Sequence, residues 1–153
     1  MKSISNAGDL DQRVGRILSE LRSRGQRVTP QRAAIIRLFL GRRDHPSADD
    51  IHRDLQAEYP MVALSTVYST LSLLVEMGEA VEVPPEVSRT RFDPDVADHC
   101  HLICLSCGAV IDVPPHEVES DGATENFIRA RDFHAVRQVR EVYGYCAECA
   151  GKA

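Results

Sequence analysis

The chain has 153 residues, a formal net charge of −5 and a hydrophobic content of 43%. This length is enough for one ordinary domain or two small ones with real cores. No apolar run approaches the roughly 20 residues that span a bilayer, and the opening segment "MKSISNAGDLDQRVGR" lacks the apolar stretch of a secretion signal. We therefore expect a cytoplasmic protein that neither crosses a membrane nor is secreted.

The charge is distributed unevenly along the chain. Nine arginines stand against two acidic residues between Leu10 and Arg43, whereas five basic residues stand against ten acidic ones from Pro94 to the end. A basic N-terminal block joined to an acidic C-terminal half indicates two modules with different partners. The alternative is a solvated, arginine-rich helix face.

The first two predicted helices lie within the basic block. Apolar residues at helical spacing predict a helix over 10–24, and Gly25 suits its end. In "VTPQRAAIIRLFLG", Thr29 is a good N-cap and Pro30 fits the first helical position. Gly41 is expected to end this second helix.

Two more helices follow. "HPSADDIHRDLQAEYP" predicts a third helix with Ser47 as its N-cap and Pro60 after its end. "LSTVYSTLSLLVEMG" predicts a fourth, with Ser65 as N-cap and Gly78 as its stop. Next, "EAVEVPPEVSRTRFD" contains two short alternating segments, 79–83 and 88–93, which predict a β-hairpin.

Helices followed by a two-stranded hairpin are typical of a winged helix-turn-helix, in which the fourth helix would enter the DNA major groove. One face of that helix is simply core, but the other carries short polar groups and a tyrosine suited to base edges and phosphates. The expected DNA contacts are Arg27, Gln31, Arg32, Ser65, Thr66, Tyr68, Ser69 and Thr70.

The character of the chain changes beyond Asp93. "HLIC" and "AVIDV" predict strands, 117–131 a helix, and "AVRQVREVYGYC" an alternating strand. We predict an α+β protein with a winged helix-turn-helix domain over 1–93 and a small α/β domain over 94–153.

Two Cys-x-x-Cys pairs fall in this second domain. Cys104 and Cys107 form the first pair, and Cys146 and Cys149 the second. Four thiolates make the tetrahedral set that zinc prefers. Redox dithiols or free cysteines are the alternative, because paired cysteines in a reducing cytosol serve either purpose.

His99 and His101 remain beside the first cysteine pair. Residues i and i+2 of a strand face the same side, so these imidazoles should converge while Cys100 points the other way. A His-x-His pair beside acidic residues favours a second metal site. Cys100 is most simply a buried apolar residue, with a ligand or a redox-active thiol as the alternative.

Together these segments resemble the ferric uptake regulator family of metal-responsive repressors, over about residues 14 to 149. The resemblance rests on "RVTPQR", "HPSADDIH", "STVYSTLSLLVEMG", "SRTRFDPDVADHCHLICLSCGAVIDV" and "YGYCAEC". It implies a winged-helix DNA-binding domain, a C-terminal dimerisation domain, a structural Zn2+ and a regulatory metal near the hinge. A symmetric homodimer would bind double-stranded DNA at an A·T-rich inverted repeat.

By position, the resemblance implies a regulatory site made of His45, Asp93, His99, His101 and Asp112. Three nitrogens and two carboxylates suit Fe2+ or Mn2+, and ligands from both domains would let the metal fix their orientation.

Two departures resemble the peroxide-sensing (PerR-type) branch of the family. Asp112 stands where iron- and zinc-sensing members usually have glutamate, and no histidine lies closer to the last cysteine pair than His134. In that branch, iron-catalysed oxidation would modify His45 and His99.

The sequence thus predicts a metal-dependent DNA-binding transcriptional repressor that senses peroxide, and not an enzyme. An iron- or manganese-responsive uptake repressor of the same family is the alternative, and a zinc or dithiol redox protein is a distant one. A zinc hydrolase needs an open zinc position and a nearby general base, and the sequence has no His-Glu-x-x-His motif.

Overall fold

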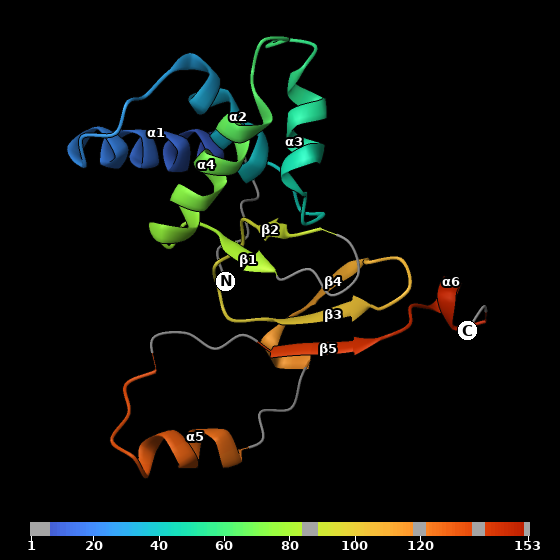
Figure 1. Ribbon diagram of the computed structural model, residues 1–153. Coiled ribbons are helices and arrows are strands. Elements are labelled where there is room, and N and C mark those ends of the chain that lie inside the picture. The colour runs from blue at the N-terminus through green and yellow to red at the C-terminus, as the bar shows by residue number, and fades with distance from the viewer. Residues whose placement is uncertain (1–6, 84–88, 118–121, 136–139, 152–153) are drawn as a thin grey trace. The chain divides into compact units, whose positions relative to one another are not determined.

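The computed structural model describes residues 7–83, 89–117, 122–135 and 140–151, and it mixes helices with small sheets. The predicted α+β class is confirmed. The described residues up to Val96 form one compact unit, and those from Ala97 onward form a second (Figure 1).

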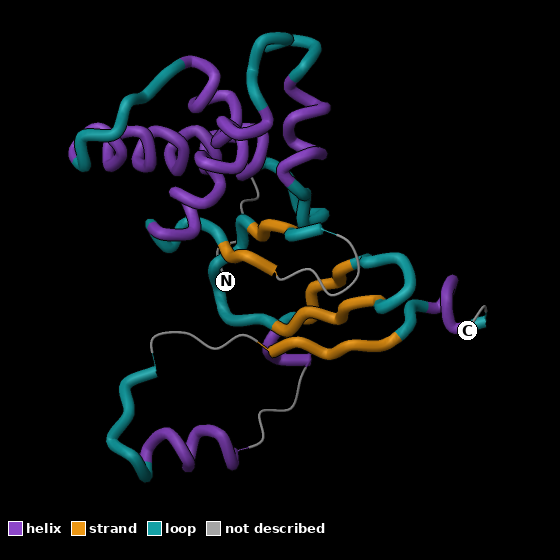
Figure 2. Tube along the Cα trace, in the orientation of Figure 1, coloured by secondary structure: helices purple, strands orange, loops and turns teal. Residues whose placement is uncertain are grey.

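The first unit consists of helices packed on one apolar core, followed by a short hairpin (Figure 2). Its elements are α1 (Ala7–Ser23), α2 (Pro30–Leu40), α3 (Ala48–Leu55), α4 (Leu64–Glu76), β1 (Val81–Val83) and β2 (Arg91–Asp93). Each helix contributes fully buried side chains, such as Ile17, Phe39, Ile51 and Leu71. The two strands are antiparallel with Val81 opposite Asp93, and the turn predicted around Pro84 lies outside the described residues.

Side chains cap two of these helices as predicted. The hydroxyl of Thr29 accepts a hydrogen bond from the Arg32 N–H at the start of α2. At the start of α3, Ser47 and Asp50 bond each other's backbone N–H groups, which makes a capping box. The predicted cap at Ser65 is wrong. The N-cap lies two residues earlier, at Ala63, which makes no side-chain hydrogen bond, and helix α4 begins at Leu64, which packs against the core.

Replacing Ser47 with alanine is expected to destabilise the first unit by about 0.5–2 kcal/mol. The Ser47 hydroxyl donates to Asp50 and lowers the pKa of its carboxyl from 3.8 to about 2. The pKa of Asp50 is lower in the folded state than in the unfolded state. Its contribution to the free energy of unfolding is therefore fully present above the unfolded-state pKa and is lost as the pH falls through the folded-state pKa. Urea unfolding followed by circular dichroism should show the loss near neutral pH and a shrinking difference at acid pH.

Ser65→Ala is the matched control for this change. Ser65 is exposed in the first turn of α4 and caps nothing, so its removal should change stability by less than about 0.5 kcal/mol. Equal losses in both variants would contradict the capping account.

The second unit is built on a three-stranded sheet in the order β4-β3-β5. Its elements are β3 (Cys100–Cys104), β4 (Val110–Val113), a 3-10 turn η1 (Pro115–Glu117), α5 (Gly122–Arg129), β5 (Arg140–Gly144) and α6 (Ala147–Ala150). The central strand β3 runs antiparallel to β4 and parallel to β5. Helix α5 is shorter than the predicted 117–131, because Glu117 belongs to η1 and a turn follows Arg129. Among the described residues, no helix combines the length and the apolar character that a membrane span requires.

Candidate metal centres and DNA-binding helix

The four paired cysteines come together at one end of the sheet. Cys104 ends β3, and its parallel partner on β5 is Gly144, two residues before Cys146. Strand pairing therefore brings the two cysteine pairs side by side although they are distant in sequence. The Sγ atoms of Cys104, Cys107, Cys146 and Cys149 all lie within 4.8 Å of one another.

The electrostatics of this cluster favour a bound cation. The backbone N–H of Cys146 donates to Sγ of Cys104 at 3.4 Å and, as the largest effect, lowers the pKa of that thiol to about 6. At Cys149 a hydrogen bond from Ser106 lowers the pKa, but the neighbouring sulfurs outweigh it and raise the pKa to about 12. The four neighbouring thiols cannot all lose their protons together, because the resulting negative charges repel one another. A bound divalent cation offsets that repulsion and stabilises all four as thiolates. The donor set is the four-thiolate site of a structural Zn2+.

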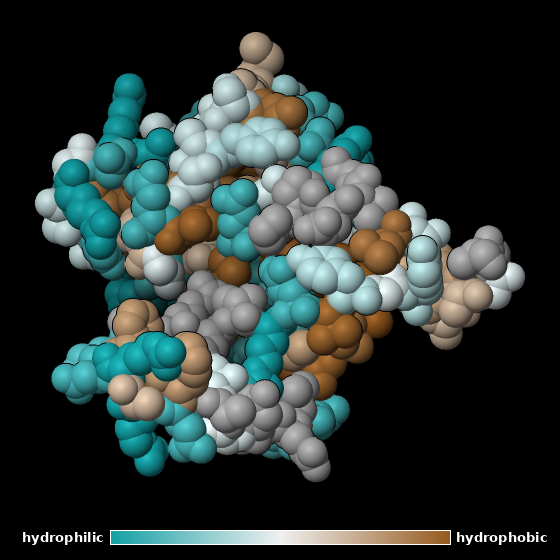
Figure 3. Space-filling model, turned by 60° about the horizontal axis from the view of Figure 1, so that its bottom comes forward, coloured by the Kyte–Doolittle hydropathy of each residue, from teal (hydrophilic) through white to brown (hydrophobic). Residues whose placement is uncertain are grey.

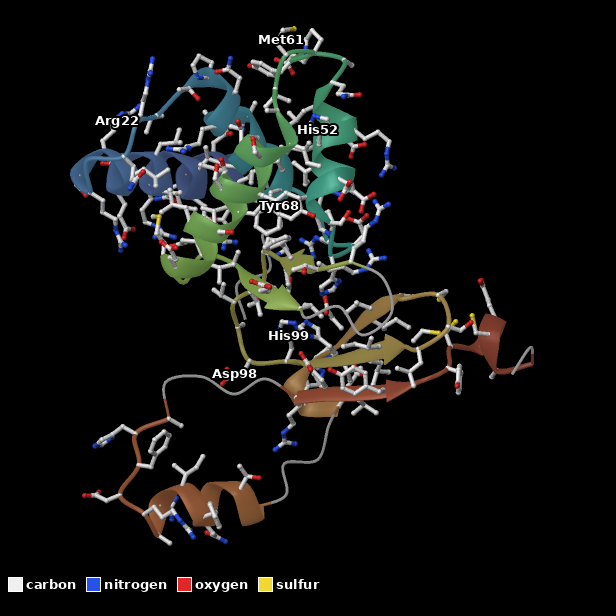
Figure 4. All side chains as sticks on the ribbon, viewed as in Figure 1. Arg22, His52, Met61, Tyr68, Asp98 and His99 are labelled. Carbon is white, nitrogen blue, oxygen red and sulfur yellow. The ribbon has the colours of Figure 1, made fainter. Side chains whose placement is uncertain are left out.

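A second group of ligand atoms lies on the same sheet. His101 on β3 is paired in register with Asp112 on β4, and His99 lies just before β3 (Figure 4). The Nε2 atoms of the two imidazoles are 2.7 Å apart, and each lies 3.5 Å from Oδ1 of Asp112. The predicted convergence of the imidazoles is confirmed. Cys100 is buried, with 4% of its surface exposed, as predicted for an apolar residue.

The first unit contributes a histidine and an aspartate that face each other. His45 lies in the loop between α2 and α3, and Asp93 ends β2. His45 Nε2 is 3.7 Å from Asp93 Oδ2, and the two side chains are 2% and 3% exposed. The backbone joins these segments, because Arg91 donates to the His45 carbonyl and the Phe92 N–H donates to the Pro46 carbonyl.

The backbone of His45 is unusual. Its φ is +49°, a left-handed conformation that costs a non-glycine residue roughly 1–2 kcal/mol. Such strain persists where the surrounding structure holds it, and it is concentrated at functional sites. The pair of His45 and Asp93 and the group of His99, His101 and Asp112 offer only nitrogen and oxygen donors. Such donors suit Fe2+ or Mn2+. They fit the regulatory metal that the sequence predicts.

Helix α4 presents most of the predicted polar face to solvent. Ser65, Tyr68 and Ser69 are exposed, and Thr66 is half-buried. Tyr68 lies between α4 and α3, and its hydroxyl donates to Asp49 at 3.5 Å (Figure 4). The prediction that Thr70 belongs to this face is wrong. Its side chain is only 1% exposed and its hydroxyl donates to the Thr66 carbonyl, because position 70 falls on the core stripe of α4.

The arginine-rich block is less available to phosphates than its net charge indicates. Within the first unit Arg13 and Arg16 bind Glu79, and Arg24, Arg37 and Arg42 also pair with carboxylates. Among the predicted DNA contacts, Arg27 and Gln31 are exposed, and half-buried Arg32 donates to the Arg27 carbonyl. The alternative of a solvated, arginine-rich helix face therefore holds for part of the block, where exposed Arg24 and Arg37 pair with carboxylates.

A helical unit ending in a two-stranded hairpin, joined to a unit with thiolate and imidazole–carboxylate sites, defines a metal-binding winged-helix regulator. Residues 23–142 match the ferric uptake regulator family, and the chain belongs to that family. Members are transcriptional regulators that bind DNA as dimeric repressors.

The chain is similar to proteins from more than one part of this family. It is 33% identical over 135 residues to the peroxide-responsive repressor PerR of Staphylococcus saprophyticus, covering 88% of this chain and 90% of that protein. The peroxide stress regulator of Campylobacter jejuni is 27% identical, with a TM-score of 0.69 over 86% of this chain and 98% of its own. The ferric uptake regulator Fur of Helicobacter pylori has a TM-score of 0.79 over 98% of this chain and 97% of its own, and its 19% identity shows the fold alone.

Proposed function

We propose that this metalloregulator is a repressor that senses peroxide through a regulatory iron, whose oxidation chemistry modifies His45 and His99. The observation that carries the proposal is the donor set in the second unit, where two imidazoles and the short carboxylate of Asp112 converge without a thiol. Iron in such a set has nitrogen and oxygen ligands. The similarity to relatives named as peroxide-responsive repressors supports the same function.

The regulatory metal is proposed to take ligands from both units. His45 and Asp93 would come from the DNA-binding unit, assigned to residues 1–93, and His99, His101 and Asp112 from residues 94–153. Three nitrogens and two carboxylates then surround one Fe2+ or Mn2+. The chain passes from the first unit to the second after Val96, three residues beyond Asp93. A shared metal would therefore fix the orientation of the DNA-binding units, and loss of the metal would free that orientation.

The second unit is proposed to hold the homodimer together. Leu102 on β3 stands directly opposite Ile111 on β4 and Val142 on β5, and 38%, 51% and 54% of these side chains are exposed. An apolar row across a sheet is the kind of surface that a partner covers. Figure 3 shows apolar surface, in brown, open to solvent on one face of the molecule. A second copy of the chain would bury this row and set two α4 helices for an inverted repeat.

The second candidate is an iron- or manganese-responsive uptake repressor. The same imidazole–carboxylate set favours it, because reversible binding of Fe2+ or Mn2+ needs no oxidation step. The two functions differ in the response of the iron form to peroxide. A dithiol redox protein is a distant third. The feature in its favour is that Cys146, two residues after the end of β5, is the N-cap of helix α6.

The DNA-binding part of the proposal is tested with Mn2+ and an A·T-rich inverted-repeat duplex selected from a random library. Tyr68→Ala is expected to weaken binding of the Mn2+ form by roughly 1–3 kcal/mol if the ring packs on base edges. Rising salt should weaken binding, with a slope that counts phosphate contacts. The dependence of log affinity on log salt should be shallower than if all nine arginines of the N-terminal block contacted phosphates. At least five of those arginines are ion-paired within the first unit.

Tyr68→Phe is the control for this experiment. It keeps the ring and removes only the hydroxyl that contacts Asp49, so its affinity should stay close to that of the parent protein. Binding that ignores both Mn2+ and the Tyr68 ring would count against the proposed function.

A further inference from the structure

A guanidinium from α1 contacts the segment that carries Asp93, the proposed ligand of the regulatory metal. Arg13 Nη2 donates to the carbonyl oxygen of Pro94 at 2.9 Å and to that of Glu79, also at 2.9 Å. Pro94 is buried, and the Arg13 side chain is 16% exposed. One side chain thus joins α1 to the residue after Asp93 and to the junction between α4 and β1.

Glu79 holds this guanidinium in place. Its side chain is 10% exposed, and its carboxylate accepts from Arg13 Nε at 3.4 Å and from Arg16 Nη1 and Nη2 at 2.7 and 3.0 Å. A buried carboxylate shared by two guanidiniums is strongly oriented. The pKa of Glu79 lies below its ordinary value, because these arginines outweigh the opposing effect of burial.

The contacts of Asp93 show what this clamp would position. Val81, two residues after Glu79, is the strand partner of Asp93, and Asp93 Oδ1 accepts the Asp95 N–H at 2.8 Å. Backbone bonds on one side and Arg13 on the other therefore restrain the chain around the ligand. Groups that orient a metal ligand from outside the coordination sphere commonly change metal affinity by about 10- to 100-fold when they are removed.

We propose that Arg13 is a positioning residue for the regulatory metal, holding Asp93 in place through the Pro94 carbonyl and linking the metal ligand to α1 and the end of α4. This inference rests on the proposed regulatory site. It goes beyond that site, because it assigns a role to a residue that is not a ligand and because it connects helix α1 to Asp93 through the Pro94 carbonyl.

The direction in which Mn2+ affinity changes when Arg13 is replaced distinguishes a positioning role from a purely electrostatic one. Removing a cation near a metal site strengthens metal binding by Coulomb's law, whereas loosening a ligand weakens it. Arg13→Gln in the zinc-loaded protein is expected to weaken Mn2+ binding by about tenfold in calorimetric titration. Without Mn2+, the backbone amide hydrogens of residues 91–93, 95 and 96 should also exchange faster than in the parent protein.

Arg16→Gln is the matched control, because Arg16 binds the same carboxylate and does not contact Pro94. It should change Mn2+ affinity less than about twofold. Arg13→Lys keeps the charge, but an ammonium lacks the planar fork that spans two carbonyls and a carboxylate. It should resemble Arg13→Gln, and it replaces that variant if the latter does not fold.

Unchanged or stronger Mn2+ binding in both Arg13 variants would overturn the proposal, as would unchanged exchange or an equal loss in Arg16→Gln. A parent protein that binds no Mn2+ would instead contradict the proposed function. The two failures are therefore distinguishable.

Discussion

Replacing Cys146 with serine is expected to remove the structural zinc and to unfold the second unit or abolish its dimer. The described part of that unit has a small apolar core, with only Cys100, Ile103 and Cys104 buried among its hydrophobic residues. Metal binding coupled to folding contributes on the order of 10 kcal/mol in such sites, as much as the whole stability of many domains. Metal analysis and sedimentation should show a zinc-free, monomeric or aggregated protein.

Cys100→Ala is the control for the zinc prediction. Cys100 is as buried as Cys104 but does not belong to the four-cysteine cluster, so this variant should keep its zinc. Cys146→Ser with a full zinc complement and an intact dimer would contradict the assignment. A parent protein with reactive thiols and no zinc would favour the dithiol redox alternative, in which Cys146, the N-cap of α6, would be the reactive thiol.

A brief dose of hydrogen peroxide is expected to damage the Fe2+ form at a histidine and leave the Mn2+ form intact. Iron held by the regulatory ligands would catalyse the transfer of one oxygen atom from hydrogen peroxide to a neighbouring imidazole, which leaves water as the other product. His45 and His99 are the expected targets, and each would gain one oxygen atom. Mass spectrometry of peptides from both metal forms should find this adduct on a peptide with His45 or His99 in the iron form alone.

Thiol oxidation is the competing route. Cys100 is buried, whereas Cys107 in the zinc cluster is exposed, so an oxidant reaches Cys107 more directly. Oxidation there would release zinc in both metal forms. If Cys100→Ala abolishes the response to peroxide while His45 and His99 stay unmodified, the sensor is a thiol.

Local signals in the sequence were sufficient for much of the fold and for the zinc cluster. Thr29 and Ser47 cap their helices as predicted because a cap depends on its own few neighbours. The Cys-x-x-Cys spacing and the i, i+2 spacing of His99 and His101 likewise determine which atoms converge. The regulatory set that joins His45 and Asp93 to these histidines stays a prediction.

Other features depend on packing between distant segments and could not be predicted. Thr70 is buried because it lies on the face of α4 that packs against the core. Helix α4 begins before Ser65 because Leu64 also packs against that core. The contact of Arg13 with Glu79 joins residues 66 positions apart. The net charge of the N-terminal block could not predict this ion pair, because composition does not show which arginines lie beside carboxylates in the folded unit.

We expect a regulatory metal to control DNA binding and peroxide to act through iron at that metal site. The most direct measurement is the affinity of the zinc-loaded protein for the selected inverted-repeat duplex, with Fe2+ or Mn2+, before and after a brief dose of peroxide. Either metal should strengthen binding by about 5- to 150-fold over the form without regulatory metal, and peroxide should abolish that gain in the Fe2+ form alone. Equal binding with and without metal, or equal loss in the Fe2+ and Mn2+ forms, would contradict the account.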